Sequence, residues 1–163
     1  MTSTFSIRRR VQFSETDLAG IVHFSNFFRY MEEVEHAFYR SLGLTVHGME
    51  GDETGSIVGF PRVHASADYR KPLRFEEEFE IELLVKEVRP RTMEHAIAFW
   101  KLSEAGDRGE LAATGRLVVV CVTKDEAAGG MRAVIIPDRL ASQLEPAAPE
   151  LIDNIAAGKG VTP

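Results

Sequence analysis

The chain of 163 residues contains a single cysteine, Cys121, and no long apolar run. One cysteine forms neither an intrachain disulfide nor a thiolate metal cluster, and its apolar neighbours in LVVVCVT indicate a buried strand position. No apolar segment approaches the roughly 20 residues that cross a membrane. The first residues also lack the apolar stretch of a secretory signal. We therefore expect a cytoplasmic protein without a membrane partner.

Basic residues are in the minority, with 19 Lys and Arg against 25 Asp and Glu, and the net charge is −6. A nucleic-acid surface needs a basic stripe that displaces phosphate counterions, so we expect no nucleic-acid partner. The sequence also lacks a glycine-rich phosphate loop, a G-x-S-x-G nucleophile elbow and a pair of histidines at metal-ligand spacing. We therefore expect no metal and no cofactor.

Apolar periodicity predicts one long helix and several strands. Residues 25–42 carry apolar side chains at three- and four-residue steps, as in an amphipathic helix, and Gly43 is a suitable stop. Alternating apolar residues predict a first strand at 5–13. After a glycine-rich loop at 45–56 come four further strand-like segments, at 57–69, 78–88, 92–102 and 111–123.

Short turns join these later strands, which favours antiparallel neighbours because a parallel connection needs a longer crossover. The prediction is an α+β fold in which an antiparallel sheet of five or six strands wraps around one long helix. Residues 132–137 are expected to add an edge strand or to lead into a short helix at 138–144. Strands such as LVVVCV are apolar on both faces, so we expect another subunit to cover the outer face.

The domain organisation is expected to be simple. A chain of this length is in the usual range of one domain. Residues 1–144 are predicted to form that domain. Residues 145–163 are small, polar and punctuated by proline, so a flexible tail is expected there.

Three polar residues, His64, Ser66 and Asp68, share one face of a predicted strand and superficially resemble a hydrolytic triad. Residues two apart on a strand lie roughly 7 Å apart, which is too far for the direct hydrogen bonds that a nucleophile and its base need. We therefore expect a polar face at solvent or at a subunit interface, and we keep His64 as a candidate to line a site.

Asp17 lies just ahead of the predicted helix, in TDLAGIVHFSN. An aspartate at this place can simply cap a turn, and Gly20 favours a tight turn. A helix N-terminus, however, presents unpaired N–H donors that polarise a bound carbonyl oxygen. Asp17 can then act as a nucleophile or as a general base for water. This pairing describes ester or thioester hydrolysis.

The stretch VQFSETDLAGIVHFSNFFRYMEEVEHAFYRSLGL resembles the opening of the hot dog fold acyl-CoA thioesterases, in the 4-hydroxybenzoyl-CoA thioesterase family. The similarity extends over about residues 5–138. It implies a hot dog fold, an acyl-CoA substrate, and a homodimer or homotetramer with active sites at the dimer interface. It also implies that Asp17 is the catalytic carboxylate, and that backbone N–H groups near His23 and Phe24 polarise the thioester carbonyl.

The same resemblance marks residues for substrate binding. Arg89 and Arg91, in the turn VRPRT, are candidates for the CoA phosphates, with solvated arginines in a hairpin as the alternative. The helix residues Phe27 and Tyr30 are expected to line the acyl pocket. The remaining candidates for substrate binding are Gly20, Asn26, His64 and Ser66.

Two alternatives to thioester hydrolysis stay open. A hot dog dehydratase acting on 3-hydroxyacyl thioesters would use a histidine and an acidic residue across the dimer, but GIVHFSN lacks the proline-rich segment expected after its histidine. A catalytically silent acyl-CoA binding protein would share every feature described above. The sequence also leaves open whether the acyl group is aromatic or aliphatic, and whether CoA or a carrier protein bears it.

Overall fold

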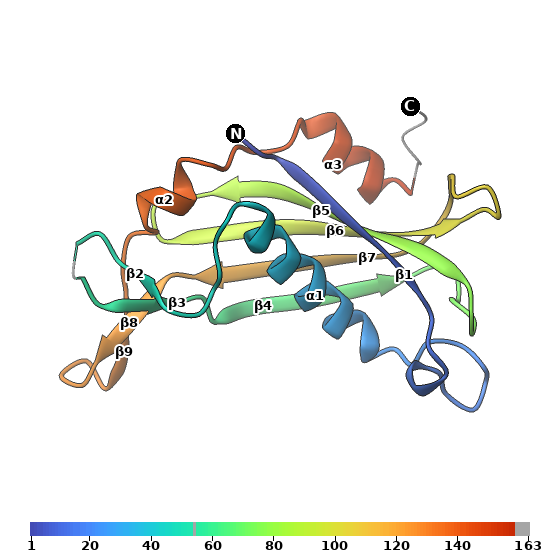
Figure 1. Ribbon diagram of the computed structural model, residues 1–163, viewed down its shortest axis with the longest axis horizontal. Helices are drawn as coiled ribbons and strands as arrows, with labels where there is room; N and C mark the ends of the chain where they lie inside the picture. Colours follow the sequence, from blue (N-terminus) through green and yellow to red (C-terminus); the bar gives the residue numbers. More distant parts are fainter. Residues whose placement is uncertain (54, 159–163) are drawn as a thin grey trace.

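The structure, a computed structural model, describes residues 1–53 and 55–158. Its main feature is a five-stranded antiparallel sheet that curves around one long helix (Figure 1). The helix is α1 (Asn26–Ser41), and the strands, in their order across the sheet, are β1 (Thr4–Arg10), β5 (Glu78–Val88), β6 (Thr92–Leu102), β7 (Arg108–Val120) and β4 (Arg62–Tyr69). This arrangement confirms the predicted α+β class and the wrapping of the sheet around a helix.

Helix α1 forms because its apolar side chains recur every three or four residues and so share one face. Gly43 ends it with a φ of 72°, a left-handed conformation that a glycine adopts without steric cost. The buried face packs onto the concave side of the sheet, and its apolar members are Phe27, Tyr30, Met31, Val34, Phe38 and Tyr39.

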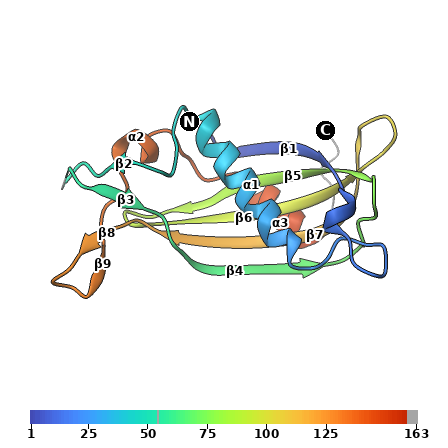
Figure 2. The ribbon, with the colours of Figure 1, turned by 60° about the horizontal axis from the view of Figure 1, so that its bottom comes forward.

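The sheet buries both of its faces. Along β6, Ile97 and Phe99 belong to the core beneath α1, whereas Ala98 and Trp100 belong to a second cluster on the opposite face. Alternate residues of a strand point to opposite faces, so this division follows directly from the pleat. Helix α3 (Pro149–Ala156) covers the second face, and Figure 2 shows α1 and α3 on opposite sides of the sheet.

Helix α3 corrects two expectations. Residues 145–158 do not form a flexible tail, and a helix of the same chain covers the outer face, where another subunit was expected. The reason is a short amphipathic pattern in which Leu151, Ile152 and Ile155 share the face that packs onto the sheet, behind Pro149 in the first turn. The remaining tail residues, 159–163, lie outside the described residues.

A second, smaller sheet breaks two of the predicted strands. The segment 57–69 is interrupted at Phe60 and Pro61, and the segment 111–123 at Cys121. The first predicted strand is also shorter, because a 3-10 turn η1 (Phe13–Glu15) replaces its end. The small sheet contains, in order, β2 (Met49–Glu50), β3 (Ile57–Gly59), β8 (Val122–Asp125) and β9 (Gly130–Ala133).

An edge strand or a short helix was expected after residue 131, and the structure has both. Strand β9 ends at Ala133, and the short helix α2 (Asp138–Ala141) follows it. Within the part of the chain that the structure describes, none of the helices is long and apolar enough to cross a membrane.

Candidate active site

Asp17 lies in a tight turn between η1 and α1. Its Oδ1 accepts a hydrogen bond from the N–H of Ala19 at 2.8 Å, and its carbonyl accepts one from the N–H of Gly20 at 3.0 Å. Gly20 has a φ of 74°, so the turn itself requires this glycine. Within the described residues no hydrogen bond reaches Asp17 Oδ2. The turn therefore fixes the carboxylate while it leaves one oxygen free.

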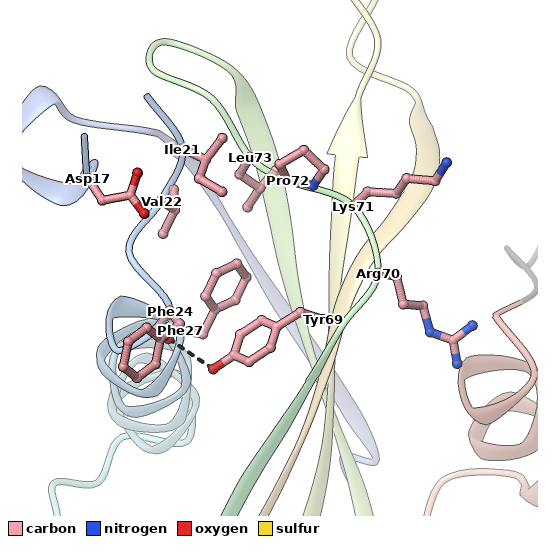
Figure 3. A pocket seen from close by; sticks show the side chains of 10 residues that line it. All are labelled: Asp17, Ile21, Val22, Phe24, Phe27, Tyr69, Arg70, Lys71, Pro72 and Leu73. Carbon is pink, nitrogen blue, oxygen red and sulfur yellow. Dashed lines mark hydrogen bonds between the residues drawn. The ribbon is translucent and has the colours of Figure 1, made fainter. Parts of the chain in front are cut away.

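A cavity of about 390 Å³ lies beside Asp17 (Figure 3). This volume is within the range of small-molecule sites. The side chains of Arg70 and Lys71 extend away from the centre of the cavity, so its interior is mostly apolar. The cavity is lined by Asp17, Ile21, Val22, Phe24, Phe27, Tyr69, Arg70, Lys71, Pro72 and Leu73.

One residue that lines the cavity, Phe24, has a free backbone donor at the start of α1 within the described chain. The N–H of His23 already donates to the carbonyl of Glu15 at 2.9 Å, whereas the N–H of Phe24 donates to no acceptor in the described part of the chain. Of the two amides that the family resemblance marks, only that of Phe24 is therefore available. It sits at the positive end of the α1 dipole, where it can polarise a carbonyl oxygen.

Tyr69 lies beside Phe24 in the wall of the cavity. Its hydroxyl donates to the carbonyl of Phe24 at 3.0 Å, as the dashed line in Figure 3 shows. Burial raises the pKa of Tyr69, so the phenol keeps its proton and remains a donor. The rings of Phe27 and Tyr69 meet edge to face, with centroids 5.1 Å apart. This contact holds β4 against the first turn of α1.

The side chain of His23 does not line the cavity. Its Nδ1 lies 2.8 Å from the hydroxyl of Ser25, and its ring contacts that of Phe24 in a tilted arrangement with a centroid distance of 4.5 Å. The imidazole therefore supports the start of α1, and nothing in its contacts joins it to Asp17.

Two expected substrate contacts have other partners in the structure. Asn26 donates from Nδ2 to the carbonyl of Glu15 at 2.8 Å. Tyr30 is only 2% exposed, and its hydroxyl donates to Oε2 of Glu15 at 2.8 Å. Neither side chain lines the cavity, whereas Phe27 does. The helix stripe thus contributes one aromatic residue to the cavity and two residues that hold the preceding loop.

His64 and Ser66 lie on β4, the strand that ends at the cavity residue Tyr69, but neither of them lines the cavity. His64 Nε2 is 3.1 Å from the hydroxyl of Ser66, so the expectation that residues two apart on a strand cannot hydrogen bond is wrong here. The two side chains lean along the strand and close the distance that separates their backbones. Within the described residues Asp68 joins neither of them, so no triad is formed.

Arg89 and Arg91 lie in the turn between β5 and β6, at the far end of the sheet from Asp17. The near end of β5 is marked by Glu78, which pairs with Arg10 shortly before the Asp17 turn. Eleven residues of β5 separate the two ends, or about 35 Å of extended chain. Arg89 is exposed and pairs with Glu87 at 2.9 Å. Within one chain these arginines therefore lie far from the cavity, and their contact with the CoA phosphates stays a prediction.

Glu15 is the residue that the sequence analysis missed. It accepts hydrogen bonds from five donors around the Asp17 turn, through its carboxylate and its carbonyl. One signal was visible, because Arg9 interrupts the apolar side of the first predicted strand. A charge on such a face needs a buried partner, and Glu15 supplies it at 2.8 Å.

Among the described residues, no group of three or more His, Cys, Asp or Glu side chains is arranged to hold a metal ion.

Comparison with known proteins assigns this chain to a family. Residues 11–144 match the thioesterase-like superfamily. A hypothetical protein from Aquifex aeolicus is 33% identical, and the alignment covers 86% of this chain and 99% of that one with a TM-score of 0.71. The 1,4-dihydroxy-2-naphthoyl-CoA hydrolase of Prochlorococcus marinus (strain MIT 9303) is 30% identical over 92 residues, which are 54% of this chain and 61% of the hydrolase.

The 4-hydroxybenzoyl-CoA thioesterase of Pseudomonas sp. strain CBS-3 has the same fold, with a TM-score of 0.71 over 86% of this chain and 99% of that one, at 22% identity. The expected hot dog fold is thereby confirmed. Because the family model matches residues 11–144, which are most of the chain, the chain belongs to the thioesterase-like superfamily.

Proposed function

We propose that this protein hydrolyses an acyl-CoA thioester to a free carboxylic acid and CoA, with Asp17 as its catalytic carboxylate. The observation that carries the proposal is the shared cavity of Asp17 and Phe24. Within the described residues, Oδ2 of Asp17 accepts no hydrogen bond and the N–H of Phe24 has no acceptor, and both residues line this cavity. These are the two groups that acyl transfer needs, one for the attack and one for the oxyanion.

The chemistry balances with these two groups. Asp17 either attacks the thioester carbonyl, giving a mixed anhydride that water then hydrolyses, or takes a proton from a water molecule that attacks directly. In both routes the carbon–sulfur bond breaks and the sulfur leaves as a thiolate. An ordinary thiol has a pKa of about 8.5, so the leaving group requires little help from a general acid.

The lining of the cavity supports an aromatic acyl group. Phe24, Phe27 and Tyr69 surround the interior, and among the described residues that line it Asp17 supplies the only carboxylate. Aromatic rings favour edge-to-face and offset contacts with a planar ligand. Two of the similar proteins are also named for aromatic acyl-CoA substrates. We therefore propose that aromatic acyl-CoAs are better substrates than aliphatic ones of similar size.

We also propose that the protein is a homodimer. Strand β4 pairs with β7 on one side only and lies at the edge of the main sheet, with most of its residues exposed. An open edge of eight residues is a template for a second strand. Sedimentation equilibrium should therefore give at least twice the monomer mass, and a monomer at micromolar concentration would contradict this part of the proposal.

The test of the proposed activity is thiol release from a panel of aromatic and aliphatic acyl-CoAs, measured with a thiol-reactive dye. The wild type is compared with Asp17→Asn and with the matched control Asp68→Asn, which changes an exposed aspartate on β4 that does not line the cavity. Circular dichroism confirms that each variant is folded.

We expect Asp17→Asn to lose at least about 100-fold in kcat, since it removes the nucleophile or base, and Asp68→Asn to keep the wild-type rate. Equal rates for all three proteins would reduce Asp17 to a turn residue. A wild type that binds acyl-CoA but releases no thiol from any member of the panel would favour the catalytically silent binding protein instead.

A further inference from the structure

We propose that Glu15 is a positioning residue for the reaction, which holds the loop that carries Asp17 against the N-terminus of α1. The inference rests on the proposed function, because it assumes that Asp17 and the N–H of Phe24 act together. Glu15 lies two residues before Asp17, at the end of η1, and its contacts reach β1 on one side and α1 on the other.

The carbonyl of Glu15 fixes the path of the loop. It accepts one hydrogen bond from the N–H of His23 at 2.9 Å and a second from Nδ2 of Asn26 at 2.8 Å. An isolated antiparallel bridge between Thr16 and Val22 continues this contact. Asp17, whose N–H donates to the carbonyl of Ile21 at 2.9 Å, lies inside this paired stretch, and Phe24 follows directly after it. The relative placement of the carboxylate and the free N–H therefore depends on these pairings.

The carboxylate of Glu15 anchors the same loop to the body of the protein. Oε1 accepts a hydrogen bond from Nη1 of Arg9, on β1, at 2.8 Å. Oε2 accepts one from the hydroxyl of Tyr30, on α1, at 2.8 Å and one from the N–H of Gln12 at 2.9 Å. A single side chain thus joins the first strand, the turn η1 and the long helix.

Arg9 completes the network. Its guanidinium lies over the ring of Tyr30, 4.8 Å from the centroid, and its Nε is 3.1 Å from Oε2 of Glu33. The side chains of Arg9 and Glu15 are only 22% and 16% exposed. Removal of one partner from such a partly buried pair leaves the other charge without compensation, so the network depends on a charged residue at position 15.

The ionisation of Glu15 agrees with this role. Burial by itself would raise the pKa of the carboxyl group, but the hydrogen bonds from Gln12, Arg9 and Tyr30 outweigh it and lower the pKa. Glu15 is therefore an acceptor at neutral pH, whereas a glutamine amide replaces one of its acceptor oxygens with a donor.

Glu15 does not act on the substrate directly. It does not line the cavity, and both of its carboxylate oxygens already accept hydrogen bonds. Its influence on the reaction passes through the geometry of Asp17 and Phe24. A displacement of reacting groups by about 1 Å is enough to cost on the order of 100-fold in rate.

The experiment compares kcat and KM for the best acyl-CoA in the wild type, Glu15→Gln, Glu15→Asp and Tyr30→Phe. The matched control is Glu33→Gln, which also removes a carboxylate bound to Arg9 but leaves the loop untouched. We expect Glu15→Gln to lose about 10- to 100-fold in kcat with KM within about threefold of the wild type. Tyr30→Phe should show a smaller loss, Glu15→Asp should recover part of the rate, and Glu33→Gln should match the wild type.

Amide hydrogen exchange supplies a readout that does not require activity. In Glu15→Gln we expect exchange in residues 12–24 to rise at least about tenfold, while β5 and β6 keep their wild-type protection, because only the local network is broken. Wild-type kcat and wild-type exchange in Glu15→Gln would overturn the inference. In that case the proposed function still stands if Asp17→Asn is inactive. If Asp17→Asn instead retains full activity, the proposed function fails, and the exchange data still decide whether Glu15 holds the loop.

Discussion

The guanidinium of Arg70 donates a hydrogen bond to the carbonyl of Ala156 at 3.0 Å. Arg70 belongs to the wall of the cavity, and Ala156 is the last residue of α3 on the outer face of the sheet. The C-terminal end of a helix carries partial negative charge, so a cation is favoured at this place. The wall of the proposed active site is thus tied to a helix from the other end of the chain.

The first prediction concerns this link. Arg70→Ala removes the cation from the end of α3 and should cost about 1 kcal/mol, which lowers Tm by roughly 2–4 °C for a chain of this size. The control is Lys71→Ala, since Lys71 is exposed and pairs with an exposed Glu110 at 3.5 Å, and such pairs contribute little. Differential scanning calorimetry measures both variants. Equal melting temperatures for the two would show that the link to α3 adds no stability.

A second prediction uses Trp100, the only tryptophan of the chain. Trp100 is fully buried in the cluster that α3 covers, and its indole N–H donates to Oε2 of Glu82 at 3.0 Å. Ile155→Asp places a charge into this cluster and should displace α3, because an unpaired buried carboxylate is strongly unfavourable. We expect a red shift of tryptophan emission and a lower urea midpoint.

The control for α3 is Asp153→Asn, at an exposed position of the same helix. It should leave the emission maximum unchanged. If Ile155→Asp also kept the wild-type emission, the cover over Trp100 would not depend on α3.

The third prediction is a loss of stability in mild acid that originates at His95. This residue is fully buried in β6, and its Nδ1 lies 3.7 Å from Oε1 of Glu35 on α1. Burial, together with the positive charge of Arg62 on β4, lowers the pKa of His95 from 6.5 to about 4. In the folded protein the ring therefore stays neutral until the pH falls to about 4.

The unfolded chain takes up this proton near its ordinary pKa, and the native chain does not. The contribution of His95 is fully present above pH 6.5 and is lost as the pH falls toward 4. Between pH 7 and pH 5 this proton uptake lowers the free energy of unfolding by about 2 kcal/mol. Glu35 offsets part of this loss of stability. Burial raises the pKa of its carboxyl group, so as the pH falls the folded protein takes up a proton there before the unfolded chain does.

Urea unfolding of the wild type and of His95→Gln at pH 7 and pH 5 measures this effect. The wild type should lose about 2 kcal/mol more than the variant over that interval, because glutamine does not titrate. The control His64→Gln changes an exposed histidine of β4 and should lose as much as the wild type. The same loss in all three proteins would assign the acid sensitivity to other groups.

Much of the fold could be predicted because its elements bury one face each. The stripe of α1 and the alternation in β5 and β6 follow from that burial, and these segments lie close to where periodicity puts them. The errors arise where local pattern and tertiary structure diverge. Pro61 breaks a strand that alternation continues, and the short α3 has a helical pattern too brief to outweigh its tail-like composition.

In the candidate site, too, local features could be predicted, whereas contacts that only the folded chain creates could not. The role of Asp17 stays a prediction, which was possible because its signals are local: a carboxylate, a glycine turn and the start of a helix. The role of the Phe24 amide was implied by the family resemblance and also stays a prediction. The network of Glu15 was not found, because its partners Arg9 and Tyr30 come from a strand and a helix that only the folded chain brings together. The distance of Arg89 and Arg91 from Asp17 could likewise not be predicted, since the sequence alone does not say at which end of the sheet a hairpin lies.

The order of strands in the main sheet has a consequence for synthesis of the chain. Thr4 of β1 pairs with Leu84 of β5, and Arg62 of β4 pairs with Val119 of β7, so the partner of each strand emerges from the ribosome much later. Contacts of such long sequence separation form slowly. The apolar face of α1 therefore lacks its complete sheet until β7 has been made, and a holding chaperone can bind the nascent chain during that interval.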